Sequence, residues 1–186
     1  MSSIKQYSTV CLIILSFFVT SSNVFSQQMK PVKVDSNIVA SVKKDVWIPF
    51  MESYRDLDEE KLISIHTSDI LRISINSNKI ETGSDYLDNL ESSFQMVKQM
   101  NRQMNITFSI ISSATTEDKV YQTGYYAFSS KAKDAAHFIP RGYSFFSVLL
   151  TKDKDSGAWR ISLDADKPVK FTQEEFMKSG TIYKLD

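Results

Sequence analysis

Residues 106–164 contain four stretches in which apolar and polar side chains alternate, and this pattern constrains the fold more than any other feature of the chain. Alternation with a period of two is typical of β-strands that bury one face. The four stretches are separated by turn or loop residues and cover residues 106–114, 120–129, 143–151 and 159–164. Three segments of helical period and one short hairpin precede them. This order predicts an α+β fold in which a curved, mainly antiparallel sheet wraps around three N-terminal helices as a cone with a pocket inside.

The first helical segment has a wide apolar stripe suited to packing against a core. Its members recur at every fourth residue and are Ile38, Val42, Val46, Phe50 and Tyr54. Ser36 or Asn37 is expected to cap this helix, and Pro49, which removes one backbone hydrogen bond, is expected to kink it. Asp58 is expected to cap a second, shorter helix.

The residues after the second helix predict a hairpin and a third helix. Residues 70–75 form the first hairpin strand, and residues 79–81 return as its partner. Thr82 with Asp85 fits a capping box for the third helix. A longer connection is expected at residues 131–141. Lys167-Pro168 is expected to end the sheet, and residues 172–178 can form two helical turns capped by Thr172.

The beginning of the chain has the layout of a secretory signal peptide. Lys5 precedes an apolar run at residues 10–19, and small residues follow up to a plausible cut before Gln27. We therefore expect a signal peptide at residues 1–26, a flexible leader at 27–35, the cone-shaped domain at 36–166 and a tail with a short helix at 167–186. The expected location is periplasmic or secreted, without membrane association after cleavage; a retained membrane anchor is the alternative.

Composition excludes several classes of partner and cofactor. Cleavage would leave about 160 residues, which suits one domain. The net charge is near zero and no basic stripe is present, so nucleic acid is not an expected partner. The single cysteine, Cys11, lies in the expected signal peptide, which leaves no disulfide or thiol chemistry. The two histidines lie far apart and no glycine-rich phosphate loop occurs, so we expect neither a metal site nor a cofactor.

Several short motifs carry a family resemblance by their order and spacing. They are the helix end Tyr54-Arg55-Asp56-Leu57-Asp58, the segment Leu62-Ile63-Ser64-Ile65-His66, the strand start at Asp69, the helix start at Gly83 and the closing strand Gly157-Ala158-Trp159-Arg160-Ile161-Ser162-Leu163-Asp164. Residues 36–166 resemble the nuclear transport factor 2-like superfamily in its SnoaL-like branch. The resemblance implies the cone fold, and it covers both enzymes and binding modules.

The resemblance argues against one kind of chemistry. Ketosteroid isomerases of this superfamily use an acidic base on the first hairpin strand and an oxyanion-stabilising tyrosine on the first helix. Those positions correspond here to Ser74 and Phe50. Serine is a poor base without a partner and phenylalanine has no donor, so isomerase chemistry of that type is not expected.

Two residues are weak catalytic candidates, and each has a structural alternative. His66 is either a general base at the pocket mouth or a ring packed at a helix C-terminus, where positive charge is favoured. Asp164 is either an acid or ligand anchor inside the cone or a surface charge beside Arg160 on the outer face. The alternation of the last strand places Asp164 opposite Trp159, Ile161 and Leu163, which favours the surface position.

The pocket of such a cone would be lined by side chains of the helices. The residues expected there as ligand contacts are Trp47, Phe50, Tyr54, His66, Tyr86 and Phe94. Adjacent aromatic pairs such as Tyr125-Tyr126 and Phe145-Phe146 give the sheet large apolar groups on both faces. An uncovered apolar face usually marks a partner surface. The resemblance also implies dimerisation there, so we expect a homodimer through the outer sheet face.

Three functions remain open at this level. The first is an exported, non-catalytic domain that binds a small, largely apolar ligand or a peptide in its cone. The second is a lyase, cyclase or isomerase that uses His66, Tyr54 or Asp164, which requires at least two ionisable groups converging in the pocket. The third is a structural dimer whose cone is filled by its own side chains.

Overall fold

The computed structural model describes residues 34–185. The expected signal peptide and most of the expected leader lie outside the described residues. Asp35, expected in the leader, instead caps the first helix: its carboxylate accepts the backbone N–H groups of Asn37 and Ile38. The expected cap at Ser36 or Asn37 is therefore wrong by one or two residues. No helix within residues 34–185 has the length and apolar character needed to cross a bilayer.

The first helical segment is continuous but changes its hydrogen-bond pattern along its length. It runs as α2 (Ser36–Val42), a π-helical stretch η1 (Lys43–Trp47) and α3 (Ile48–Asp56). The π-helical stretch ends just before Pro49, which lies near the start of α3 and lacks the N–H that an interior helical position requires. The helix is thus locally widened just before Pro49, and the kink at Pro49 stays a prediction.

The two remaining N-terminal helices follow the local sequence signals closely. Asp58 caps α4 (Glu59–Ser64) by accepting the N–H of Lys61, as predicted. The third helix, α5 (Gly83–Gln99), begins after Thr82, but the Thr82 side chain makes no capping hydrogen bond. The capping box expected from Thr82 and Asp85 is therefore wrong, although the position of the helix is right.

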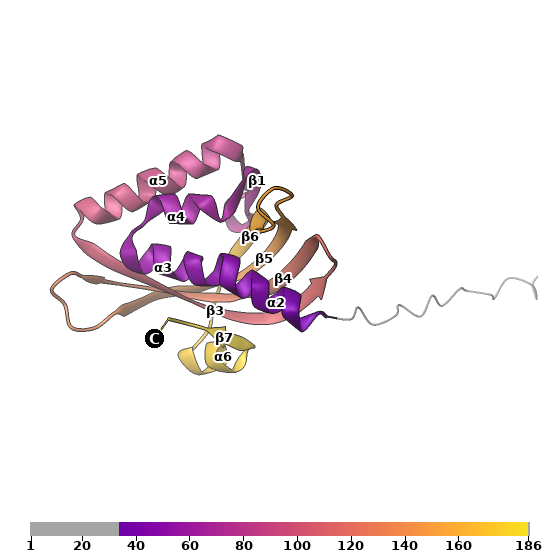
Figure 1. Ribbon diagram of the computed structural model, residues 1–186. Coiled ribbons are helices and arrows are strands. Elements are labelled where there is room, and N and C mark those ends of the chain that lie inside the picture. Colours follow the sequence, from indigo (N-terminus) through magenta and orange to yellow (C-terminus); the bar gives the residue numbers. More distant parts are fainter. Residues whose placement is uncertain (1–33, 186) are drawn as a thin grey trace, which may run out of the picture. The chain divides into compact units, whose positions relative to one another are not determined.

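Seven strands form one sheet in the order β2-β1-β6-β5-β4-β3-β7, antiparallel except between β1 and β6. Their bounds are β1 His66–Ser74, β2 Lys79–Thr82, β3 Arg102–Thr115, β4 Lys119–Ala132, β5 Ile139–Lys152, β6 Trp159–Val169 and β7 Thr181–Tyr183. In Figure 1, α3, α4 and α5 lie on one side of this sheet and the C-terminal helix lies on the other. The predicted α+β architecture is confirmed.

The strands are longer than their alternation indicated. The first hairpin strand begins at His66 instead of residue 70, because β1 pairs with β6 from that point. The expected connection at residues 131–141 is shorter in the structure, because both of its ends are strand and residues 133–138 join β4 to β5. β6 continues through Lys167-Pro168 to Val169, so the sheet does not end there. Cross-strand pairing supplies this extra length.

A bulge in β6 reverses the direction of the side chains that follow it. Leu150 pairs with Ile161 and Leu149 with Leu163, so Ser162 has no partner on β5. A bulge of this kind re-aims the side chains beyond it. Trp159 and Ile161 face the helices before the bulge, and Asp164 faces the same side after it. The surface position favoured for Asp164 is therefore wrong, because the alternation does not run unbroken.

The C-terminal tail belongs to the sheet and covers part of its outer face. Its helix α6 (Gln173–Lys178) begins with the predicted cap at Thr172, completed by Glu175 as a capping box. Strand β7 then pairs with β3, where a Cβ on Gly180 would lie 2.3 Å from the Ile110 carbonyl oxygen. Only glycine permits this approach. The tail expected at residues 167–186 therefore contributes a strand to the same sheet as residues 36–166.

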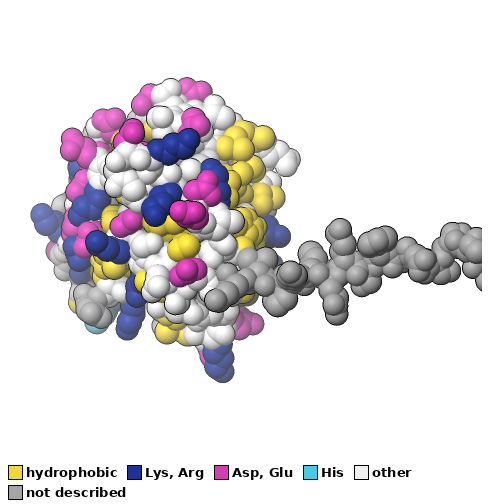
Figure 2. Space-filling view, turned by 45° about the vertical axis from the view of Figure 1, so that its right-hand side comes forward, with side chains coloured by type: hydrophobic (Ala, Val, Ile, Leu, Met, Phe, Trp, Pro, Cys, Tyr) yellow, Lys and Arg dark blue, Asp and Glu magenta, His cyan; other side chains and the backbone are white. Residues whose placement is uncertain are grey.

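Aromatic side chains of the tail pack on the outer face of the sheet. The ring of Phe171 lies 4.4 Å from that of Tyr125, and Phe176 lies 5.4 Å from Tyr143, measured between centroids. Tyr121 remains 45% exposed farther along β4. Figure 2 shows acidic and basic side chains interspersed over the visible surface, with hydrophobic side chains gathered along one side. The tail thus reduces the apolar area that was expected to be free on this face.

Candidate functional site

A cavity of about 470 Å³ lies between the N-terminal helices and the concave face of the sheet. This volume is typical of sites that take small molecules. Most of its wall is apolar, and the apolar lining residues are Trp47, Phe50, Phe94, Val97, Met104, Ile106, Phe108, Phe128, Phe146, Val148 and Ile161. Trp47 is fixed by its indole N–H, which donates to the Gln122 side chain at 2.8 Å. Gln122 in turn donates to Ser113, so the buried polar groups are satisfied.

The structure places five of the six expected ligand contacts on this cavity. They are Trp47, Phe50, Tyr54, Tyr86 and Phe94. Phe50 stacks on Tyr54 with centroids 5.4 Å apart, and Phe94 meets Tyr54 edge-on. The sixth, His66, is not a lining residue. It lies behind the wall, with its ring edge-on to Phe50 and Tyr86.

His66 is buried and electrically neutral. Its Nδ1 lies 2.8 Å from the Leu62 carbonyl oxygen, which requires the proton on Nδ1 and leaves Nε2 unprotonated and without a partner among the described residues. Burial lowers the pKa of His66 to about 4. The ring does pack at a helix C-terminus, as one alternative held, but it is uncharged there. A general base at the pocket mouth is excluded by its position.

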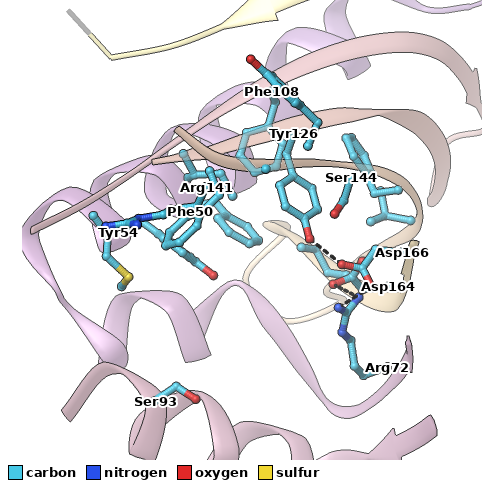
Figure 3. Close-up of a pocket in the computed structure, with 18 of the residues that line it drawn as sticks. Phe50, Tyr54, Arg72, Ser93, Phe108, Tyr126, Arg141, Ser144, Asp164 and Asp166 are labelled. Carbon is cyan, nitrogen blue, oxygen red and sulfur yellow. Dashed lines mark hydrogen bonds and ion pairs between the residues drawn. The ribbon is translucent and has the colours of Figure 1, made fainter. Parts of the chain in front are cut away.

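Four polar side chains lie together in the cavity wall, and we call them the wall cluster: Arg72, Tyr126, Asp164 and Asp166 (Figure 3). Arg72 Nη2 lies 2.7 Å from Asp166 Oδ1, and Arg72 Nη1 lies 3.0 Å from Asp164 Oδ2. The second contact is an ion pair without regular hydrogen-bond geometry. Tyr126 donates its hydroxyl to Asp166 Oδ2 at 2.5 Å. The side chains of Arg72 and both aspartates are only 13–15% exposed.

The wall cluster arises from the parallel pairing of β1 with β6. Arg72 pairs in register with Asp164, and Ser74 with Asp166. The β6 bulge then turns both aspartates toward the cavity. Sequence reasoning considered Asp164 but missed Arg72, Asp166 and Tyr126. One sequence signal could have indicated this cluster: a single arginine, Arg72, lies between Leu71 and Ile73. A charged side chain on a buried apolar strand needs an acidic partner, so Arg72 predicts a carboxylate nearby.

Burial and neighbouring charges shift the protonation of this site. Burial raises the pKa of Asp164 to about 6, and Asp166 adds to the effect while Arg72 opposes it. Burial, and then the field of Asp164, raise the pKa of Tyr54 to about 12. The same causes raise the pKa of Tyr86 well above its ordinary value. Both tyrosines therefore stay protonated, and Asp164 is the group that changes charge near neutral pH.

The site can hold a small molecule and exchange a proton with it. A carboxyl of pKa near 6 can serve as acid or base at neutral pH. The requirement for at least two ionisable groups in the pocket is met by the wall cluster. Phe50 lines the cavity without a donor and Ser74 does not line it, so the ketosteroid isomerase arrangement is absent at these positions. Within residues 34–185, no group of three or more His, Cys, Asp or Glu side chains is placed to hold a metal ion.

The fold is similar to that of solved structures that include a ketosteroid isomerase-like protein, so the cone-shaped α+β fold implied by the resemblance is confirmed. Neither a protein-family model nor a curated protein matches the sequence.

Several solved structures are similar to this chain in fold. Aln2 from a Streptomyces species superposes with a TM-score of 0.60 at 12% identity over 73% of this chain and 93% of that one. ActVI-ORFA from Streptomyces coelicolor gives a TM-score of 0.59 at 12% identity over 72% and 98%. A ketosteroid isomerase-like protein from Erwinia carotovora atroseptica gives 0.54 at 14% identity over 74% and 100%. At these identities, activity must be argued from the site itself.

Proposed function

We propose that this protein is a non-catalytic binding domain for a small, largely apolar molecule held in the cone. The observation that supports this most is the 470 Å³ cavity, whose wall is apolar apart from a few convergent polar groups. Arg72 and Asp166 are already paired with each other, so they offer a polar contact without a net excess of charge. The ligand would therefore be an apolar body with a hydroxyl group that donates a hydrogen bond to Asp164. A cone filled by its own side chains does not fit this empty volume.

A fluorescence titration with N-phenyl-1-naphthylamine, an uncharged apolar dye, tests the proposal. Val97→Trp places a large ring in the cavity wall and is expected to weaken binding at least about tenfold, because it removes volume that the dye needs. Met96→Trp is the matched control, since Met96 is the preceding residue of α5, is 55% exposed and does not line the cavity. Equal affinities for the two variants and the wild type would contradict binding in the cone.

A second candidate is a lyase, cyclase or isomerase, and the raised pKa of Asp164 favours it. In such an enzyme Asp164 would be the acid–base group, and Tyr54 or Tyr86 would donate a hydrogen bond to the substrate. His66 would take no part in the reaction, because it lies behind the cavity wall. A molecule that co-purifies with the protein would distinguish the two functions. Conversion of that molecule by the wild type but not by Asp164→Asn would establish the enzyme, whereas unchanged release from both would support binding.

We also propose export and a homodimer. Export is supported by the signal-peptide layout of residues 1–26. A homodimer through the outer sheet face is supported by the aromatic side chains there, of which Tyr121 is exposed. Native mass spectrometry of the exported protein would report the dimer and any retained ligand together. A monomer without the first 26 residues would support export and contradict the dimer.

A further inference from the structure

Two arginines converge on one hydroxyl group, and one of them, Arg141, lines the cavity. Arg102 Nη2 donates to Ser130 Oγ at 2.9 Å, and Arg141 Nε donates to the same oxygen at 2.8 Å. Ser130 is buried, whereas Arg141 is exposed and lines the cavity. We call Arg102 and Arg141 the rim pair. In Figure 3, Arg141 lies well apart from Arg72 and the two aspartates, so the rim pair is separate from the wall cluster.

The rim pair has no acidic partner within residues 34–185, since neither guanidinium forms an ion pair there. Their surroundings are also basic. Lys131 and Lys133 follow Ser130 along the chain, and Asp134 is the only acidic residue among residues 133–138 of this hairpin turn. Two adjacent guanidiniums repel each other, and an anion between them removes that repulsion. The planar guanidinium group of arginine can donate two parallel hydrogen bonds to the oxygens of an oxyanion such as a carboxylate or a phosphate.

The hydroxyl of Ser130 adds a third donor. Its oxygen accepts from both arginines, and no acceptor for its own proton is found in the described part of the chain. A bound anion would supply that acceptor. Three donors would then converge on one anionic group.

The rim pair continues directly into the apolar wall. Met104 follows Arg102 on the same face of β3, and Phe128 precedes Ser130 on the same face of β4. Both Met104 and Phe128 line the cavity. A molecule with its anionic group on the rim pair would therefore have its apolar body inside the cone. The aspartates of the wall cluster repel an anion, so they disfavour the opposite orientation.

We propose that the rim pair binds the anionic group of an amphiphilic ligand, either a carboxylate or another singly charged oxyanion, whose apolar body fills the cone. This inference rests on the proposed binding function and specifies the chemical class of the ligand.

Two dyes with the same apolar body test the inference. 1-Anilinonaphthalene-8-sulfonate carries a sulfonate, and N-phenyl-1-naphthylamine does not. The wild type is expected to bind the sulfonate at least about tenfold more tightly than the neutral dye, and added salt is expected to weaken only the sulfonate complex. Arg102→Gln/Arg141→Gln should weaken sulfonate binding about tenfold or more and change neutral-dye binding less than about twofold.

A matched control removes the same charge from the other end of the sheet. Lys119→Gln/Lys152→Gln alters two lysines where β4 begins and β5 ends, and it is expected to leave both affinities unchanged. Equal weakening of sulfonate binding by the two double variants would overturn the rim assignment. Equal affinity of the wild type for both dyes would overturn it as well, and this measurement needs no variant to fold. If the wild type bound neither dye, this result would contradict the proposed binding function and, with it, the inference about the rim pair.

Discussion

The wall cluster and the rim pair both place arginine side chains on one cavity, but their electrostatic surroundings differ. Arg72 on the wall is largely buried and lies within ion-pair distance of two carboxylates. Arg102 and Arg141 both donate to the neutral hydroxyl of Ser130, and neither forms an ion pair with a carboxylate of residues 34–185. Arg72 therefore neutralises the carboxylates of Asp164 and Asp166. The rim arginines each use one N–H group on Ser130, and their other N–H groups are available to a ligand. A buried charge with partners supports the fold, and an unpaired charge at an opening is available to a ligand.

The largest expected effect is on stability, from removal of the wall arginine. Arg72→Met leaves Asp164 and Asp166 buried without their counter-ion, so we expect a loss of about 3–5 kcal/mol of unfolding free energy at pH 7. Urea denaturation measures this loss, and it should shrink at pH 5, where Asp164 can protonate. The exposed pair of Arg55 with Asp56 provides the control, because Arg55→Met removes only a solvent-screened ion pair and should cost much less unfolding free energy. Equal losses would remove the distinction between buried and exposed arginines.

A pH series on Asp164→Asn tests the charge of the wall cluster. The pKa of Asp164 is about 6 in the folded chain against 3.8 as its ordinary value. Between these values the folded state binds more protons than the unfolded state, so this group's contribution to stability falls as the pH rises. Relative to the Asn variant, the wild type should lose about 2 kcal/mol between pH 4 and pH 7. A constant difference across this range would contradict the raised pKa.

His66, just behind the wall, should show the opposite slope. Its pKa is about 4 when folded and 6.5 ordinarily, so the unfolded chain binds more protons between those values. Stability from this group is complete above pH 6.5 and is lost as the pH falls toward 4, by about 3 kcal/mol. Comparison of wild type with His66→Phe by urea denaturation at pH 4.5 and 7 isolates this slope, with His137→Phe as the exposed control. A His66→Phe difference independent of pH would show that the ring is not buried neutral.

A smaller effect is expected from the tyrosine of the wall cluster. Tyr126→Phe removes the hydrogen bond to Asp166 and should cost about 1.5–3 kcal/mol, because the acceptor is charged and largely buried. Tyr125→Phe changes the neighbouring residue, which points to the outer face, and should cost less than about 0.5 kcal/mol. Thermal or urea unfolding of both variants makes the comparison. A cost for Tyr125→Phe as large as that for Tyr126→Phe would place the hydroxyl contact in doubt.

The rim pair should have the smallest effect on stability. Arg102→Gln/Arg141→Gln removes two hydrogen bonds to Ser130 but also removes the repulsion between two cations, so we expect a change within about 1 kcal/mol. Urea denaturation at low and high salt measures it. A loss as large as that of Arg72→Met would show that the rim arginines support the fold, and the contrast between the two regions would disappear.

Features that depend on neighbouring residues were predictable from the sequence. The caps at Asp58 and Thr172 were predicted because a capping side chain reaches only two or three residues along the chain. The four long strands and the helices were predicted from their periods. Even so, the predicted strands were shorter than the observed ones. For example, β1 begins at His66 because it pairs with β6 from that residue. The five aromatic lining residues lie on helical stripes, which made their inward direction predictable as well.

The functional groups of the cavity depended on contacts between distant parts of the chain. Arg72 meets Asp164 through the parallel pairing of β1 and β6, and Asp164 faces inward only because Ser162 bulges out of register. The tail joined the sheet through the close approach of Gly180 to Ile110, and Arg102, Ser130 and Arg141 met across three strands. The sequence by itself determined a cone of helices and strands with an apolar interior, because periodicity is local. Only the tertiary structure decided which charges face that interior, because one extra residue in a strand reverses every side chain after it.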